Sequence, residues 1–214
     1  MLPSTAMTLL RADPNSFLLN NGLTIDGGPA DGDTYFCFGH SDAAHAWAAG
    51  AAGPNEVWKA GDATGGGMGI VESMVDGLRL QPAHNLRMIP NTAAVTYNAI
   101  PHLHLTAAGS DMVFTGTLTG CTIIISANAA RTDVRLAHLR PGGVRGGAFS
   151  EQERIRGSGQ LNGAGATHLF GPSDYYHGTC CANVMGIRQG GAWEIYGQVF
   201  HRNPRRVREV QRIL

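Results

Sequence analysis

The chain has 214 residues, and its 16 basic and 16 acidic side chains give a formal net charge of zero. This balance excludes the strongly basic surface with which nucleic-acid-binding proteins attract phosphate groups. The length is enough to bury a sizeable core, and the sequence has neither an internal repeat nor a low-complexity linker, which favours a single domain over residues 1–214. The 30 glycines, about twice the usual share, predict many turns between short elements.

Neither a secretory signal nor a membrane span is expected. Residues 1–20 lack a basic start followed by an apolar run, and no apolar run approaches ~18 residues. The four cysteines show no CxxC spacing, which argues against a thiolate zinc site, and two of them are adjacent and so would point to opposite faces of a strand. We interpret them as reduced thiols, typical of a cytosolic working environment. They are Cys37, Cys121, Cys180 and Cys181.

The first part of the chain predicts few regular elements. Residues 1–40 are expected to form short strands and turns, punctuated by glycine, proline and aspartate. Ser41 or Asp42 is a suitable N-cap for an alanine-rich helix that would end near Ala52. The glycine-rich stretch 61–69 lacks the spacing of a phosphate-binding loop, so a surface loop is favoured over a phosphate site.

After residue 91 the pattern changes to short runs rich in β-branched and apolar residues, which predict strands. The tail from Pro204 to Leu214 is expected to be helical, with Asn203 as its N-cap. Many short strands with a few peripheral helices and long loops indicate an α/β or α+β sandwich. The expected strands cover residues 93–97, 103–106, 112–117, 122–126, 133–139, 165–170, 180–188 and 192–201.

One predicted hairpin brings a cysteine and a histidine together. If residues 128–131 form its loop, Ile123 pairs with Leu136 and Cys121 pairs with His138. Directly opposed residues have Cβ atoms ~5 Å apart, which is within reach of a thiol–imidazole hydrogen bond. The period of two places the apolar pairs on the same face, so this dyad would lie at the edge of the core.

Structural roles are the alternative for each of these residues. A cysteine in an apolar strand is often only a small core residue, and Cys180 and Cys181 are expected to be structural, with a redox role as the less favoured reading. His102 and His104 share one strand face and could bind a metal, but no third ligand is evident. Ordinary packing is therefore favoured for this pair, and no metal site is predicted.

The segment 111–121, which ends in Leu118-Thr-Gly-Cys121, resembles the Leu-Ser-Gly-Cys segment of the cytotoxic necrotizing factor and Burkholderia lethal factor toxins. The departure is Thr119 in place of the serine. The chemoreceptor glutamine deamidases of the same group carry a threonine six residues before the cysteine and a histidine downstream. Thr115 and His138 match both positions here. The resemblance covers roughly residues 111–140, with a fainter likeness around 184–187 and 194–198.

The resemblance implies a Thr–Cys–His site on a sandwich of mixed β-sheets. Carried over by position, Cys121 is the nucleophile, His138 is the base, and Thr115 helps to hold the imidazole. A paired imidazolium would lower the thiol pKa and leave a thiolate. The backbone N–H groups of Gly120 and Cys121 are candidate oxyanion donors. No metal or organic cofactor is required.

The implied reaction is deamidation of a glutamine in a host regulatory protein, by a monomeric bacterial toxin or virulence effector. Such a hydrolase would leave its producer by a non-classical route and act in the host cytosol. Family targets include Rho-type GTPases and a translation-initiation helicase, and the sequence does not choose between them. The arginine-rich tail could meet an acidic partner, although a solvated helix face is favoured.

Two other functions remain open. The same dyad could support proteolysis, or transglutamination with an amine in place of water. A non-enzymatic β-rich module that binds a protein or a glycan, with Cys121 merely packed, belongs to a different class.

Overall fold

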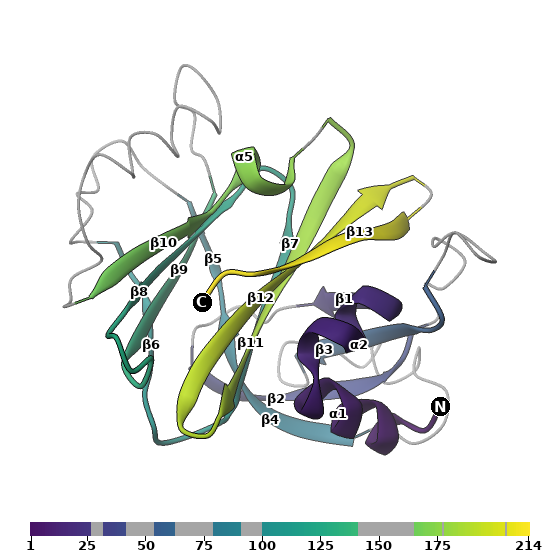
Figure 1. Cartoon of the computed structure of the whole chain (residues 1–214), viewed down its shortest axis with the longest axis horizontal. Helices are drawn as coiled ribbons and strands as arrows, with labels where there is room; N and C mark the ends of the chain where they lie inside the picture. Colours follow the sequence, from purple (N-terminus) through teal and green to yellow (C-terminus); the bar gives the residue numbers. More distant parts are fainter. Residues whose placement is uncertain are drawn as a thin grey trace.

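The computed structural model describes residues 1–26, 32–41, 54–62, 79–90, 100–140, 165–176, 178–203 and 205–214. Two β-sheets dominate this part of the chain (Figure 1). All the strands expected after residue 100 are present, with ends that differ by a residue or two. The helix expected up to Ala52, the strand expected over 93–97 and most of the loop expected over 61–69 lie outside the described residues.

The larger sheet has eight strands in the order β1-β3-β2-β4-β7-β11-β12-β13. It is mixed, because β1 runs parallel to β3 and β4 runs parallel to β7, whereas the other neighbours are antiparallel. Its strands are β1 (Gly22–Asp26), β2 (Gly32–His40), β3 (Val57–Asp62), β4 (Arg79–Leu86), β7 (Met112–Leu118), β11 (Cys180–Gln189), β12 (Ala192–Arg202) and β13 (Arg205–Arg212).

The smaller sheet is also mixed, and β9 lies inside it. Strands β8 and β6 pair antiparallel with β9, β10 pairs antiparallel with β8, and β5 pairs parallel with β9. Its strands are β5 (Met88–Pro90), β6 (Leu103–Leu105), β8 (Thr122–Ala127), β9 (Val134–Arg140) and β10 (Ala166–Phe170).

The two sheets pack face to face around one apolar core, so the fold is a sandwich of mixed sheets. The large sheet contributes Val113, Val184 and Ile195 to this core, among others. The small sheet contributes four apolar residues of the hairpin, and the prediction that its apolar pairs share one face is confirmed. They are Ile123, Ile125, Val134 and Leu136, all almost fully buried.

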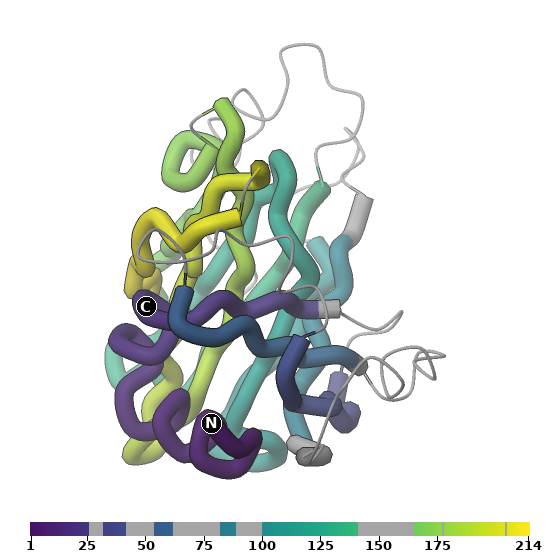
Figure 2. The backbone as a smooth tube through the Cα atoms, turned by 90° about the vertical axis from the view of Figure 1, so that its right-hand side faces the viewer, coloured from purple at the N-terminus to yellow at the C-terminus, as the bar shows by residue number. Residues whose placement is uncertain are grey.

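Two short helices cover the other face of the large sheet. Helix α1 (Pro3–Ala12) buries Met7 and Leu10, and α2 (Pro14–Asn20) buries Phe17, in a cluster that includes Phe114 of β7. In Figure 2 these helices lie at the edge of the molecule, outside the strands. None of the helices in the described ranges is long and apolar enough to cross a membrane.

The expectation of strands and turns over residues 1–40 is therefore wrong for the first twenty. Pro3 and Pro14 each occupy a first-turn position, where the missing N–H costs nothing. The side chain of Asp13 caps α2 by accepting a hydrogen bond from the Ser16 N–H at 2.9 Å. These are ordinary helix-start signals that the analysis of composition passed over.

The helix predicted for the tail is also wrong, because the tail forms β13. Strand β13 forms backbone hydrogen bonds with the outer edge of the long strand β12. The pairing runs from Tyr196 opposite Arg212 to Arg202 opposite Arg205. Val207 packs near Phe200, and Val210 packs against the core under α2. A strand that contains a bulge, and not a helix, therefore partly buries both valines. Tertiary pairing overrides the local helical pattern here.

Candidate active site

The turn between β7 and β8 places Cys121 immediately before β8. Gly120 adopts a φ of +125°, a conformation that side chains other than glycine rarely take. The chain therefore turns between β7 and β8 at a position that glycine suits. Cys121 is 4% exposed and belongs to the core between the two sheets.

The hairpin of β8 and β9 keeps the predicted faces but not the predicted pairing. Ile123 lies opposite His138, and Ala127 lies opposite Val134, so the register is shifted by two residues. The reason is a longer loop, in which the side chain of Asn128 accepts hydrogen bonds from the N–H groups of Thr132 and Asp133. A shift of two preserves the facing of every side chain, so Cys121 and His138 still lie on one face, diagonally and not directly opposed.

The hydroxyl of Thr115 joins the two sheets at this site. Its Oγ1 lies 2.6 Å from Nδ1 of His138, and both side chains are 1% exposed. Thr115 stands on β7 of the large sheet and His138 on β9 of the small sheet. The contact implied by the family resemblance is thus present in the structure, although the pairing of β8 and β9 alone does not generate it.

Burial keeps the imidazole of His138 neutral. It lowers the pKa of His138 from its ordinary 6.5 to about 4. The other ring nitrogen, Nε2, is buried and has no hydrogen-bond partner among the described residues. The histidine is therefore held at Nδ1 and has a free nitrogen at Nε2.

Cys121 opens onto a pocket of about 480 Å³. Its Sγ lies 3.6 Å from Sδ of Met88, which is 41% exposed and pairs with His138 across β5 and β9. Burial raises the pKa of the Cys121 thiol, while a backbone hydrogen bond from Thr119 and the charge of Arg140 act in the opposite direction. The pocket is lined by Met88, Thr117, Thr119, Gly120, Cys121 and Arg140.

The expected thiolate–imidazolium pair is not the state of this structure. The pKa of the thiol is raised and that of His138 is lowered, so near neutral pH both groups are uncharged. The physical reason is that both lie in the apolar layer between the sheets, where charged forms are penalised. Sequence spacing placed the dyad at the edge of the core and did not reveal how deeply the imidazole is buried.

Tyr175 holds the main chain at the cysteine. Helix α5 (Pro172–Tyr175) positions its fully buried hydroxyl between two backbone groups. The Gly120 N–H donates to this hydroxyl at 2.8 Å, and the hydroxyl donates to the carbonyl of Cys121 at 2.8 Å. The expected oxyanion donor at Gly120 is therefore already occupied, which leaves the Cys121 N–H of the two predicted. No sequence signal marks Tyr175 for this role.

A thiol–imidazole contact lies elsewhere, at Cys180, whereas Sγ of Cys121 contacts Sδ of Met88. Sγ of Cys180 lies 3.5 Å from Nδ1 of His201, its partner across β11 and β12. The neighbouring Cys181 receives a hydrogen bond from Nε of Arg202 at 2.7 Å. The two-residue turn of Gly190 and Gly191, both at positive φ, fixes this pairing. The same register argument applied to that turn would have predicted the contact.

His102 and His104 each have a protein partner. Nδ1 of His102 lies 3.0 Å from the carbonyl of Ile100, and Nε2 of His104 lies 2.9 Å from Asp133. Within the described ranges, no group of three or more histidine, cysteine or acidic side chains is arranged to hold a metal ion.

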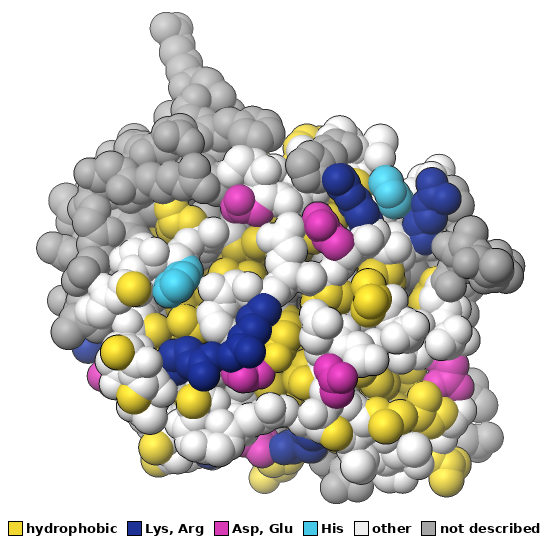
Figure 3. Space-filling model, in the orientation of Figure 1, with side chains coloured by type: hydrophobic (Ala, Val, Ile, Leu, Met, Phe, Trp, Pro, Cys, Tyr) yellow, Lys and Arg dark blue, Asp and Glu magenta, His cyan; other side chains and the backbone are white. Residues whose placement is uncertain are grey.

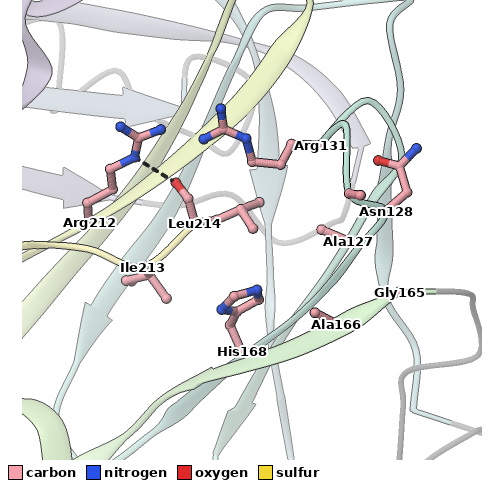
Figure 4. Close-up of a pocket in the computed structure, with 10 residues that line it drawn as sticks. Ala127, Asn128, Arg131, Gly165, Ala166, His168, Arg212, Ile213 and Leu214 are labelled. Carbon is pink, nitrogen blue, oxygen red and sulfur yellow. Dashed lines mark hydrogen bonds between the residues drawn. The ribbon is translucent and has the colours of Figure 1, made fainter.

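A larger pocket, of about 600 Å³, lies at the opposite end of β8 (Figure 4). Arg131, His168 and Arg212 surround it, with the apolar side chains of Ile213 and Leu214 between them. Both arginines face Glu194, Arg212 at 2.6 Å and Arg131 at 3.9 Å. None of the described residues that line this pocket carries a thiol, so the smaller pocket is the better candidate for covalent chemistry.

The surface carries charges of both signs. Figure 3 shows basic and acidic side chains distributed over one face of the molecule.

Comparison of the sequence with models of known protein families gave no match, and a comparison with curated proteins gave none either.

Proposed function

We propose that this protein is a cysteine-dependent protein glutamine deamidase, with Cys121 as nucleophile and His138 as general base. The observation that carries the proposal is the buried hydrogen bond between Thr115 and His138, beside a cysteine that lines an open pocket. A nucleophile, a base on the same face and a third group that orients the base are the parts that covalent catalysis requires.

The neutral imidazole suits a general-base route. With Nδ1–H donating to the Thr115 hydroxyl, the lone pair of His138 is at Nε2, the nitrogen without a partner. When a glutamine side chain enters, the thiol turns from Met88 towards Nε2 and loses its proton as sulfur attacks the carboxamide carbon. A thiol that ionises only during attack agrees with the raised pKa of Cys121.

The remaining steps return both groups to their starting state. The imidazolium gives its proton to the departing nitrogen, so ammonia leaves and a thioester forms between glutamine and Cys121. His138 then takes a proton from water, which attacks the thioester carbon and releases glutamate and the free thiol. The Cys121 N–H is the proposed donor to the oxyanion in both steps.

The test is conversion of a protein glutamine to glutamate. Wild-type protein, Cys121→Ser and Cys180→Ser are incubated with an extract of eukaryotic cells, with ammonia release and peptide mass spectrometry as readouts. Wild type and Cys180→Ser should convert a glutamine, and Cys121→Ser should not. Cys180→Ser is the matched control, because Cys180 is a buried thiol that contacts an imidazole outside the proposed site.

Each other outcome points to a different function. Loss of conversion in Cys180→Ser alone would assign the nucleophile to the other thiol. Attachment of an amine would indicate transglutamination, and a cut chain would indicate proteolysis. Absence of any Cys121-dependent product would favour a non-enzymatic binding module. We further propose that the substrate is a host regulatory protein met in the host cytosol.

A further inference from the structure

The register of β8 and β9 gives Cys121 an unexpected neighbour. The observed pairing ends with Thr122 opposite Leu139, and one further step puts Cys121 opposite Arg140. Cys121 and Arg140 also share a face, because each is two residues from the Ile123–His138 pair. The residue across from the thiol is thus an arginine, where the sequence analysis had expected the histidine.

Arg140 is available to a ligand. Its side chain is exposed and lines the same pocket as Cys121. Among the residues that the structure describes, no carboxylate forms an ion pair with it, whereas Arg11, Arg131, Arg135 and Arg212 each have an acidic partner. The charge of Arg140 acts on the Cys121 thiol and lowers its pKa against the effect of burial, so the guanidinium is electrostatically coupled to the reactive atom.

The rest of the pocket wall is polar apart from Met88. Thr117 and Thr119 are exposed. The Thr117 hydroxyl donates a hydrogen bond to Asn183 at 2.7 Å, which holds this hydroxyl in place. A planar guanidinium presents paired donors that match a carboxylate better than they match a neutral amide. The wall therefore combines one cation with neutral hydrogen-bonding groups.

We infer that the Cys121 pocket binds a carboxylate-bearing ligand, which the guanidinium of Arg140 anchors. As a statement about substrate, this rests on the proposed function: the glutamine that is deamidated has an aspartate or glutamate close to it in the target. The preference for an anion beside Cys121 does not depend on that function, and it is tested separately.

The first experiment compares alkylation of Cys121 by iodoacetate, an anion, and by iodoacetamide, its neutral counterpart. In both reactions the sulfur bonds to the methylene carbon and iodide leaves. Thiol ionisation affects both reagents equally, so it cancels in the ratio of the two rates. The ratio therefore measures how strongly the charges around Cys121 attract an anion. Rates are followed for the peptide that contains Cys121, at low ionic strength, because salt screens this interaction.

In wild type the iodoacetate to iodoacetamide ratio should exceed that of free glutathione, and Arg140→Gln should lower it by roughly 3- to 10-fold. Arg140→Lys should retain most of the preference. Arg135→Gln is the matched control, since it removes the same charge from the same strand at a position outside the pocket. A ratio unchanged by Arg140→Gln, or lowered equally by Arg135→Gln, overturns the inference.

The second experiment uses peptide pairs that carry glutamine next to aspartate or next to asparagine. Wild type should release ammonia faster from the aspartate peptide, and Arg140→Gln should remove the difference. Equal release from both peptides overturns the substrate assignment and leaves the deamidase proposal standing. If no peptide or protein is deamidated, the deamidase proposal fails, and the alkylation ratio still decides whether the pocket prefers an anion.

Discussion

At the scale of single residues, the Thr115 hydroxyl holds the orientation of the His138 ring. Nδ1 is bound to Oγ1 at 2.6 Å, so a ring that donates there keeps its lone pair at Nε2. A hydroxyl can donate or accept, so this contact admits either tautomer, and the proposed reaction uses the one with the proton on Nδ1. Thr115 therefore acts on the proposed reaction through the orientation of the base.

Replacing Thr115 with valine tests this role with almost no change of shape. Thr115→Val loses one buried hydrogen bond, worth about 1 kcal/mol, so we expect turnover to fall about fivefold while the protein stays folded. Cys121→Ala and His138→Ala should lower it much further. Ammonia release and urea unfolding are the measurements.

Thr24→Val serves as the control for Thr115→Val. It removes a strand hydroxyl that donates to the carbonyl of Trp58 at 3.1 Å in the first strands of the large sheet. A loss of activity as large in Thr24→Val as in Thr115→Val would show that the effect follows stability and not orientation of the imidazole.

The residues of the candidate site were predictable to different degrees. The common face of Cys121 and His138 follows from the alternation of side chains along two paired strands. A register error of two residues, as found here, leaves that face unchanged. Thr115 follows only from the resemblance, since its contact depends on how one sheet packs on the other. Arg140 was not singled out, because the length of the loop after β8 was underestimated.

At the scale of elements, α5 and the turn before β8 form one unit. Tyr175, the last residue of α5, receives the Gly120 N–H and donates to the Cys121 carbonyl. This fully buried hydroxyl therefore holds the main chain on both sides of the peptide bond between Gly120 and Cys121. We interpret Tyr175 as a positioning residue for Cys121.

Tyr175→Phe should keep the ring in place and release the main chain. One half-buried N–H and one buried carbonyl lose their partner, so the free energy of unfolding should fall by about 1–3 kcal/mol. If the hydroxyl positions Cys121, kcat should fall several-fold with KM little changed, under conditions where the variant is fully folded. Urea unfolding and initial rates of ammonia release give the two quantities.

Tyr196→Phe is the matched control for this prediction. Tyr196 is buried on the other side of the large sheet, and its hydroxyl donates to Glu194. It should change kcat little. Equal effects of the two substitutions on kcat would assign Tyr175 a structural role only.

Elements were predictable where pairing partners lay close in sequence. The strands after residue 100 are rich in β-branched and apolar residues, and the β11–β12 turn carries the Gly-Gly signal of a two-residue hairpin. The register predicted for the hairpin of β8 and β9 was wrong because hydrogen bonds to the side chain of Asn128 close a longer loop. The alternation of apolar residues does not indicate such a loop. The tail became a strand because β12 offered it an edge, and that edge exists only once the sheet is assembled.

At the scale of the whole molecule, the candidate site lies where the two sheets meet. His138 faces the apolar layer from the small sheet, and Thr115 faces it from the large one. Any change that separates the sheets would break this hydrogen bond and admit water to the imidazole. The site and the stability of the sandwich are therefore coupled through the protonation of His138.

Acid should weaken the fold through this histidine. The pKa of His138 is about 4 in the folded protein and near 6.5 in an unfolded chain, so between these values the unfolded state binds the extra proton. The free energy of unfolding should fall as the pH drops below about 6.5, with about 2 kcal/mol lost by pH 5 from this group. Burial also lowers the pKa of His84, which acts in the same direction.

Urea unfolding of wild type and His138→Gln at pH 7 and pH 5 measures this contribution. The Asp111 carboxyl, whose pKa Arg11 lowers, does not confuse the comparison, because its stabilisation is lost only as the pH falls through values below its ordinary 3.8. The variant should start less stable at pH 7 and lose clearly less on acidification, with His84 contributing to the loss that remains. Equal losses in the two proteins would mean that His138 is solvated in solution, which would also remove the reason for expecting a neutral base beside Cys121.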